Sequence, residues 1–401
     1  MSLARLRRDR VSSVDALRGL VMIIMALDHV RDFIHRGAML SQQATNLATT
    51  TPVLFMTRWI THFCAPVFMF TAGMGAFFYL RNSPAEAGRH AKVRLSKFLA
   101  TRGAWLIFLE LTLMQLLYNF DISPQYPIFL LVLYVLGACM IILAALIWLP
   151  LPLLAAVSVV TIVLHHLLDG PRSTSALWML LHQQGAFPFG GRVFIAAYQL
   201  VPWFAVMSLG YCVASVFSWE PARRRRFLLR AGSAMTIAFL VLRVANGYGD
   251  PSRWAWQPTA TFTLLSFLDT TKYPPSLLFL LMTLGPSLMF LSWMDQRPLS
   301  RSNPLIVFGR VPLFYFVLHF FAAHAAIVLL SLVRYGGSAM SFMFQPVPSM
   351  GGPLTAFPPG FGYDLWVAYA VWIAIVILLY PACRWFAGVK ERNRRPWLSY
   401  L

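Results

Sequence analysis

The sequence predicts an all-α, polytopic integral membrane protein with about ten transmembrane helices and both termini in the cytoplasm. Of its 401 residues, 58% are hydrophobic and only 12% are charged, whereas soluble domains carry about 25% charged residues. Apolar runs of about 20 residues, the length that crosses a bilayer, recur along the chain. The runs do not alternate polar and apolar residues, which argues against a membrane β-barrel.

The predicted spans follow one another closely, so all of 1–401 is taken as one membrane domain. The WLPLPLL segment separates the fourth span from the fifth, because proline cannot continue a helical hydrogen-bond ladder. The ten predicted spans are 14–36, 53–80, 99–119, 126–148, 151–168, 195–217, 228–247, 273–294, 304–333 and 364–386.

The net charge of +19 is assigned to membrane topology rather than to nucleic-acid binding. Connections on one side of the predicted spans hold 22 basic residues, and connections on the other side hold 6. Because cytoplasmic connections are enriched in lysine and arginine, both termini are expected in the cytoplasm. The basic start MSLARLRRDR leads directly into a long span and has no cleavable signal pattern.

The four cysteines are predicted to be buried packing residues, because each lies in or at the end of an apolar run without a close cysteine neighbour. They are Cys64, Cys139, Cys212 and Cys383. The end of the first two spans also offers metal ligands by type, namely His29, His35, Asp32 and His62. Their spacing defines no coordination geometry, so no metal is expected.

The segment MALDHVRDFIHRG places two aspartates, two histidines and an arginine within the eight positions 28–35, near the end of the first span. Charges at membrane depth are costly and usually functional. On a helix, Asp28, Asp32 and His35 share one stripe, with His29 and Arg31 beside it. A carboxylate fixes the tautomer of a neighbouring imidazole and stabilises its charged form. The spacing predicts His29 or His35 as a general base oriented by Asp32. The alternative, ion pairs that only lock the bundle, stays open.

The second span continues this polar region. Arg58 and His62 are four residues apart near the same end, and Pro66 is expected to kink the helix. His62 is a candidate site residue, and simple packing is an equal alternative. The AGMGA stretch is expected to be a close helix-packing surface rather than a nucleotide loop, because small residues let helices approach.

Further ionisable residues lie inside predicted spans. Glu110 is expected to pair with Arg243 or Arg310, and the sequence does not choose between them. His319, in the ninth span, lies at mid-membrane depth and needs a hydrogen-bond partner there.

Three segments together resemble one known family: RDRVSSVDALRGLVMIIMALDHVRDFIH, APVFMFTAGMGAFF and NPLIVFGRVPLFYFVLH. They are similar to bacterial relatives of heparan-alpha-glucosaminide N-acetyltransferase, in the transmembrane acyltransferase superfamily. The resemblance implies a multi-pass protein of the bacterial inner (cytoplasmic) membrane. Its implied reaction moves an acetyl group from cytosolic acetyl-CoA to a sugar or glycan acceptor on the outer side.

The same resemblance leaves the catalytic histidine open. The spacing from Arg18 to His29 is similar to the arginine-to-histidine spacing of acyltransferase-3 proteins, in which that histidine is essential. In the lysosomal enzyme an asparagine stands at the place of His29 and the active histidine follows later, where His35 is the nearest counterpart. The implied catalytic set is therefore His29, His35, Asp32, Asp28 and His62.

Acetyl-CoA is the implied co-substrate, and arginines are expected to hold its phosphates. The candidates are Arg18, Arg58 and Arg310, although Arg18 is equally able to pair with Asp15 on its own helix. The expected partners are acetyl-CoA, a sugar or cell-envelope glycan and membrane lipid, without nucleic acid, and a homodimer is left open.

One alternative function belongs to a different class. A proton-coupled transporter or flippase would use Asp28, Asp32 and the histidines as a proton relay and would need no CoA. The lack of an evident inverted repeat argues against it. N- versus O-acylation and a ping-pong versus a ternary-complex route also stay open.

Overall fold

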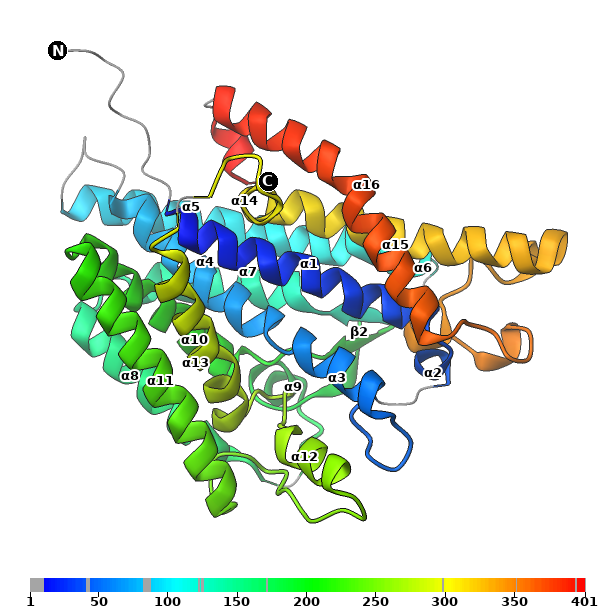
Figure 1. The fold of residues 1–401 in the computed structure, drawn as a ribbon. Helices are drawn as coiled ribbons and strands as arrows, with labels where there is room; N and C mark the ends of the chain where they lie inside the picture. The colour runs from blue at the N-terminus through cyan, green and yellow to red at the C-terminus, as the bar shows by residue number, and fades with distance from the viewer. Residues whose placement is uncertain are drawn as a thin grey trace.

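The structure, a computed structural model, describes residues 11–40, 44–81, 88–121, 123, 126–170, 172–297, 299–350, 352–393 and 395–400. Helices dominate it (Figure 1). The α-helices are α1 (Ser12–Ile34), α2 (Arg36–Met39), α3 (Pro52–Thr61), α4 (Cys64–Arg81), α5 (Arg89–Leu109), α6 (Gln115–Asn119), α7 (Val132–Leu146), α8 (Leu151–Leu164), α9 (Ala176–Leu181), α10 (Leu200–Val213), α11 (Pro221–Ala245), α12 (Ala260–Leu268), α13 (Leu277–Met294), α14 (Pro304–Arg310), α15 (Pro312–Tyr335) and α16 (Leu365–Arg392).

Shorter helical turns extend several of these helices. One π-helical turn, η2 (Glu110–Met114), joins α5 to α6. The 3-10 turns are η3 (His165–Leu168), η4 (Ala214–Ser218), η5 (Gly336–Ser341), η6 (Pro348–Met350), η7 (Leu354–Ala356) and η8 (Pro396–Ser399).

Within the described residues, seven helical stretches are long and apolar enough to cross a membrane. They are Pro52–Arg81, Leu151–Leu168, Leu200–Ser218, Pro221–Ala245, Leu277–Met294, Pro312–Ser341 and Leu365–Arg392. Each matches one predicted span, so the multi-pass helical class is confirmed. The other three predicted spans, 14–36, 99–119 and 126–148, are also largely helical. They are too charged or too short to meet the same criterion, and the total of ten stays a prediction.

The all-α prediction is wrong in one place, because three short strands form a sheet in the order β1-β3-β2. The strands are β1 (Ile128–Leu130), β2 (Gly185–Phe189) and β3 (Arg192–Ala196). β2 and β3 form a hairpin in which Phe189 pairs with Arg192 across Gly190 and Gly191. Both glycines have positive φ, at 57° and 75°, as a two-residue hairpin turn requires. The FGGR sequence carried this turn pattern, which hydropathy alone does not detect.

Proline divides two predicted spans into two helices each. α3 ends at Thr61 and α4 begins at Cys64. Pro66 has no N–H to bond the carbonyl of His62, so the expected disturbance near Pro66 is present. In the ninth span the helix breaks at Val311, directly before Pro312. These breaks set the directions of the helices that carry the polar groups.

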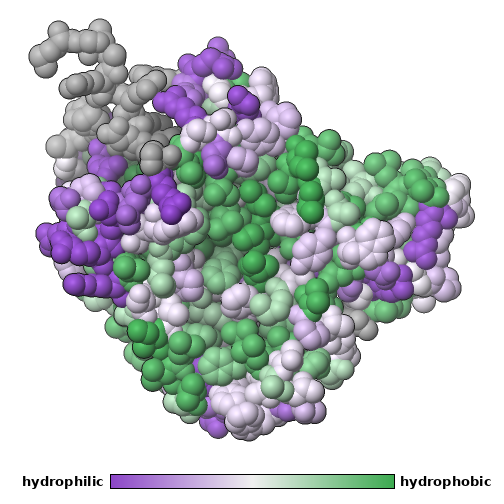
Figure 2. All heavy atoms as spheres, viewed as in Figure 1, coloured by the Kyte–Doolittle hydropathy of each residue, from purple (hydrophilic) through white to green (hydrophobic). Residues whose placement is uncertain are grey.

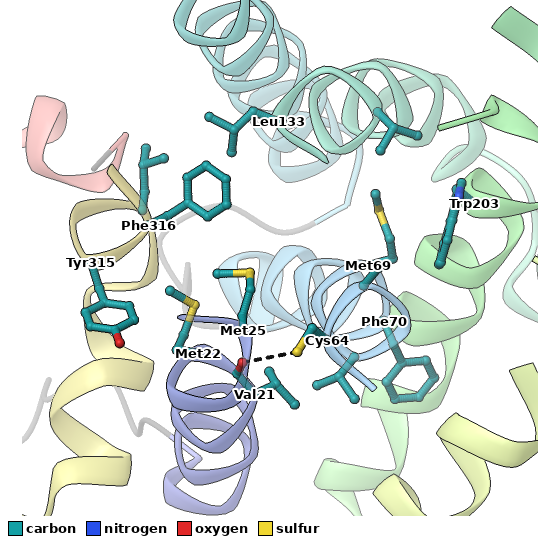
Figure 3. Packing of buried hydrophobic residues seen from close by; sticks show 14 of the residues in the cluster. Val21, Met22, Met25, Cys64, Met69, Phe70, Leu133, Trp203, Tyr315 and Phe316 are labelled. Carbon is teal, nitrogen blue, oxygen red and sulfur yellow. Dashed lines mark hydrogen bonds between the residues drawn. The ribbon is translucent and has the colours of Figure 1, made fainter. Parts of the chain in front are cut away.

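α1 lies at the centre of the bundle, against α3, α4, α13, α14, α15 and α16. Its core face packs Val21, Met22 and Met25 against α4 and α15, and the Cys64 thiol donates to the Val21 carbonyl at 3.4 Å (Figure 3). All four cysteines are free and buried, as predicted.

Glycines allow the closest helix crossings. A Cβ on Gly19 of α1 would lie 1.8 Å from the Leu305 carbonyl oxygen of α14, and one on Gly73 of α4 would lie 1.8 Å from the Met207 carbonyl oxygen of α10. Gly73 belongs to the AGMGA stretch, so the predicted helix-packing surface is confirmed.

Candidate active site

The carboxyl-terminal half of α1 and Arg58 of α3 together bring four ionisable side chains to one place. Asp28 lies 8% exposed and faces two guanidinium groups. Arg58 of α3 donates a hydrogen bond to Asp28 Oδ2, and Arg31 lies 3.1 Å from Asp28 Oδ1. Arg31 also donates to Asp32 Oδ1 at 2.6 Å. The two acids and two arginines thus neutralise each other, which lowers the cost of holding them in an apolar bundle.

His29 is hydrogen-bonded to a second histidine, His319 on α15. His29 Nδ1 lies 2.6 Å from His319 Nε2, and the two ring planes differ by 14°. His29 is half-buried, and its ring packs against Phe320 at 4.0 Å between centroids. His319 is fully buried, and its Nδ1 lies 2.9 Å from the Tyr315 carbonyl oxygen. His319 therefore has the hydrogen-bond partner that its predicted depth requires. Its Nε2 bonds His29, and its Nδ1 bonds the Tyr315 carbonyl of its own helix.

Asp32 is not placed as predicted. Its carboxylate bonds Arg31, and within the described residues it has no hydrogen bond to His29 or His35. The neighbouring guanidinium is a stronger partner for a carboxylate than a neutral imidazole is. The side chain that orients the His29 ring is instead His319.

His35 does not share the helical stripe of Asp28 and Asp32. α1 ends at Ile34, and His35 is extended at φ −74° and ψ 127°. The backbone pairs there with a distant segment, through Arg36 N to the Tyr363 carbonyl and Tyr363 N to the Ile34 carbonyl. His35 Nδ1 has no hydrogen-bond partner within the described residues. The predicted helical stripe of Asp28, Asp32 and His35 therefore ends before His35, and a catalytic role for His35 stays a prediction.

His62 follows the end of α3 and is 3% exposed. Its ring meets Phe279 of α13 edge-on at 5.3 Å between centroids, which fits the packing alternative. Arg58 lies one turn earlier on α3, so His62 borders the charged cluster. Its Nδ1 has no hydrogen-bond partner among the residues that the structure describes. A catalytic role for His62 stays a prediction.

The three arginines predicted to bind CoA fall into two groups. Arg58 belongs to the cluster around Asp28. Arg18 lies ten residues before Asp28 on α1, which places it about 15 Å away along the helix axis. There it pairs with Asp15 at 3.5 Å, as its alternative interpretation expected, and donates to the Thr71 carbonyl at 3.2 Å. Arg310 follows Gly309, whose carbonyl accepts from Arg18. Arg18 and Arg310 therefore lie together, and Arg58 lies apart.

Lys272 interacts electrostatically with Asp28 and was not among the predicted residues. It is 9% exposed, and its ammonium lies 5.1 Å from the ring centroid of Tyr273 and 5.9 Å from that of Tyr198. Asp250 holds the turn that carries it, by accepting from Thr271 N at 2.9 Å and from Ser276 Oγ at 2.5 Å. Lys272 lies in a loop, where helical periodicity does not apply. Its position beside Asp28 therefore could not be predicted from the spacing of residues in the sequence.

Glu110 pairs with neither predicted arginine. Its carboxylate accepts from the Tyr118 hydroxyl at 2.7 Å and from the backbone N–H groups of Leu133 and Tyr134 at 2.8 and 3.1 Å. It thus satisfies free N–H groups at the start of α7, where a negative charge is favoured. Arg243 is occupied by backbone carbonyls of the 252–269 loop, such as that of Ser266 at 3.0 Å.

Within the described ranges, no group of three or more histidine, cysteine, aspartate or glutamate side chains is arranged to hold a metal ion. The described side chains of the site offer imidazole, carboxylate and guanidinium groups.

The fold and these groups define a multi-pass helical membrane protein with a hydrogen-bonded histidine pair beside paired charges. Residues 10–245 match the sequence model of the family "Heparan-alpha-glucosaminide N-acetyltransferase, catalytic". The match covers more than half of the chain, so the protein belongs to this family of transmembrane acetyltransferases. Among curated proteins, none matches the chain. Asp28, His29 and Arg58 fall inside the matched range, whereas His319 and Lys272 lie beyond it.

Proposed function

We propose that the protein transfers an acetyl group from cytosolic acetyl-CoA to a sugar or cell-envelope glycan on the outer side of a bacterial inner membrane. The observation that carries this proposal is His29, a half-buried imidazole held through Nδ1 next to the Asp28–Arg58 pair. Histidine is the side chain best suited to accept a proton near neutral pH. Membership in the acetyltransferase family supports the choice of reaction.

In this reaction His29 is the general base. The acceptor's amine or hydroxyl gives one proton to His29, and its nitrogen or oxygen attacks the acetyl carbonyl carbon. A new C–N or C–O bond forms, the thioester C–S bond breaks, and the CoA thiolate takes up one proton. Asp28, Arg31 and Arg58 shape a fixed polar pocket around the reacting groups, which needs no reorganisation during the reaction.

The donor nucleotide binds at the other end of α1 in this proposal. Arg18 lies there with Arg310 and with the end of α16, because Arg310 donates to Glu391 at 3.2 Å. Basic residues of 89–102 and 223–226 add positive charge for the CoA phosphates. Arg58, which the sequence placed in this group, is assigned to the acceptor side.

Two measurements on detergent-purified protein test the proposal. Calorimetry with acetyl-CoA is expected to give a saturable heat of binding. Transfer of labelled acetyl groups to an amino sugar or a cell-envelope glycan is expected to give a labelled product. Folded protein, verified by size exclusion, that gives neither heat at millimolar acetyl-CoA nor product overturns the proposal. That result favours the transporter or flippase alternative, which has no use for acetyl-CoA.

A further inference from the structure

The histidine pair has a fixed hydrogen-bond direction. A carbonyl oxygen only accepts, so His319 Nδ1 must carry the proton that it shares with Tyr315 O at 2.9 Å. In a neutral ring the other nitrogen, Nε2, then bears the lone pair. The 2.6 Å bond to His29 therefore has His29 Nδ1 as donor and His319 Nε2 as acceptor. His29 is left with its lone pair on Nε2.

The ring geometry supports a true in-plane hydrogen bond rather than stacking. The ring centroids lie 4.9 Å apart and the planes differ by only 14°. The 2.6 Å between the two nitrogens plus the two ring radii accounts for this whole distance. The rings therefore meet edge to edge, with His29 Nδ1–H aimed along the lone pair of His319 Nε2, as a strong hydrogen bond requires.

We propose that His319 is a positioning residue, which holds His29 in the tautomer that presents Nε2 as the proton-accepting atom. The inference rests on the proposed acetyl transfer for its catalytic meaning. The described carboxylates nearby are occupied, Asp28 by Arg58 and Arg31 and Asp32 by Arg31. His319 thus takes the place that an aspartate holds beside other catalytic histidines.

The pair also balances the charge of the reaction. When His29 Nε2 takes the acceptor's proton, His29 becomes an imidazolium whose Nδ1–H points at the His319 lone pair. That proton can move to His319 Nε2, so one positive charge is shared by two rings and its far end meets the Tyr315 carbonyl. When the CoA thiolate leaves, the shared proton returns from His319 Nε2 to His29 Nδ1, and His29 Nε2 gives the acceptor's proton to the thiolate. Both rings then regain their starting tautomers.

Selective ¹⁵N-histidine NMR on the purified wild-type protein tests the tautomer without any turnover. The expected result is an unprotonated nitrogen at His29 Nε2 and a protonated one at Nδ1, assigned by comparison with His29→Gln. The opposite tautomer overturns the inference. Because this measurement needs neither acetyl-CoA nor acceptor, its failure and the failure of the proposed function are distinguishable.

Two substitutions test the positioning role. His319→Leu removes the acceptor, and kcat is expected to fall roughly 10- to 100-fold with an unchanged KM for acetyl-CoA. His319→Gln keeps a side-chain oxygen that can accept from His29 Nδ1–H, so it is expected to recover most of kcat. Equal losses in both variants, or full kcat in His319→Leu, would overturn the proposal.

His324 provides the matched control on the same helix. It is 1% exposed, and its Nδ1 bonds the Leu117 carbonyl at 2.8 Å, yet its ring stacks on Phe120 and not on His29. His324→Leu is expected to lower the unfolding temperature without changing kcat per folded molecule. A loss of kcat equal to that of His319→Leu would mean that removing any buried imidazole from α15 has this effect, and would overturn the assignment to His319.

Discussion

At the scale of single residues, Asp28 links α1 to α3. It lies on α1, where it pairs with Arg31, and it also accepts a hydrogen bond from Arg58 of α3. With Asp28 held by guanidinium groups, the neighbouring His29 turns to α15 for its partner. Adjacent residues on one helix point in different directions, so α1 separates the charge-pairing groups from the proton-accepting group. This separation is what allows different substitutions in one short segment to give different effects.

The first prediction separates the two histidines of α1. His29→Ala is expected to lower kcat by about 10²–10⁴, the usual contribution of a general base. His35→Ala is expected to change it only modestly, because His35 has left the helix and lies beside Tyr363. The assay is labelled acetyl transfer with fold verified by size exclusion. Near wild-type turnover in His29→Ala would move the base to another residue, with His62 as the next candidate.

The second prediction concerns the Asp28–Arg58 ion pair. Asp28→Asn is expected to destabilise the protein by about 3–5 kcal/mol, because it leaves the guanidinium of Arg58, whose side chain is only 18% exposed, without its partner. The double variant with Arg58→Gln is expected to lose less than the sum of the single variants. Unfolding midpoints in detergent provide the measurement. Strict additivity would show that the pair is not energetically coupled.

At the level of elements, helix packing depends on backbone contacts at single glycines. Gly73 lets α4 touch the backbone of α10, and Gly210 does the same from the α10 side, where an added Cβ would lie 2.0 Å from the Phe70 carbonyl oxygen. Gly75, two residues along α4, has no other heavy atom within 4 Å of the place of an added Cβ. The same short sequence thus contains one constrained glycine and one free position.

The third prediction uses this contrast. Gly73→Ala is expected to destabilise the protein by about 1–3 kcal/mol, because the helices must move apart to accept the methyl group. Gly75→Ala is the matched control and is expected to be neutral or to stabilise by up to about 1 kcal/mol through helix propensity. Thermal unfolding in detergent compares the two. Equal effects would contradict the close crossing of α4 and α10.

The fourth prediction concerns the loop between α11 and α13, which presents Lys272. Burial and the nearby Asp250 raise the pKa of Asp269 to about 6 from its ordinary value of 3.8, against the opposing effect of Arg243. Between these values the folded state binds more protons than the unfolded state, so stability falls as pH rises from about 4 to about 6. The expected size is about 1–3 kcal/mol, reduced by partial exposure.

Asp269→Asn is expected to remove this dependence and to stabilise the protein at pH 7. Unfolding midpoints measured from pH 4 to pH 7 provide the comparison. Asp364→Asn is the control, because Asp364 is 64% exposed in its pair with Arg36 and contributes little. An Asp269→Asn curve parallel to that of the wild type would contradict the prediction.

The sequence predicted the local features of these elements and missed the long-range ones. Apolar length and basic asymmetry predicted the helical membrane class, and the dense charge pattern of 28–35 marked the right half of α1. The partner of His29 lies 290 residues away on α15, and no spacing rule reaches that far. Glu110 bonds backbone N–H groups of α7, which no side-chain pairing rule would propose. His35 was misplaced because the end of α1 depends on pairing with Tyr363.

At the level of the whole molecule, polar side chains gather at one end of an apolar body. Figure 2 shows hydrophilic side chains where α5 begins and where α16 ends, and apolar side chains over the middle of the bundle. The contacts from Arg18 to Gly309 and from Arg310 to Glu391 join the start of α1 to the end of α16. These two ends of the described chain therefore lie on one side, as a protein with both termini in the cytoplasm requires.

The fifth prediction is the orientation of this body. Ser252 lies in the 248–272 connection, predicted to be outside, and Ser300 lies in the basic 295–302 connection, predicted to be inside; both are exposed. Ser252→Cys is expected to react with a membrane-impermeant thiol reagent on intact cells, and Ser300→Cys only after lysis. The native cysteines are buried, so their background is expected to be low. Ser83, in the 81–102 connection that the basic residues also predict to be inside, lies outside the described residues. Labelling of Ser300→Cys but not Ser252→Cys from outside would reverse the topology. It would place His29 on the same side as the cytosolic donor, so transfer across the membrane would no longer be needed.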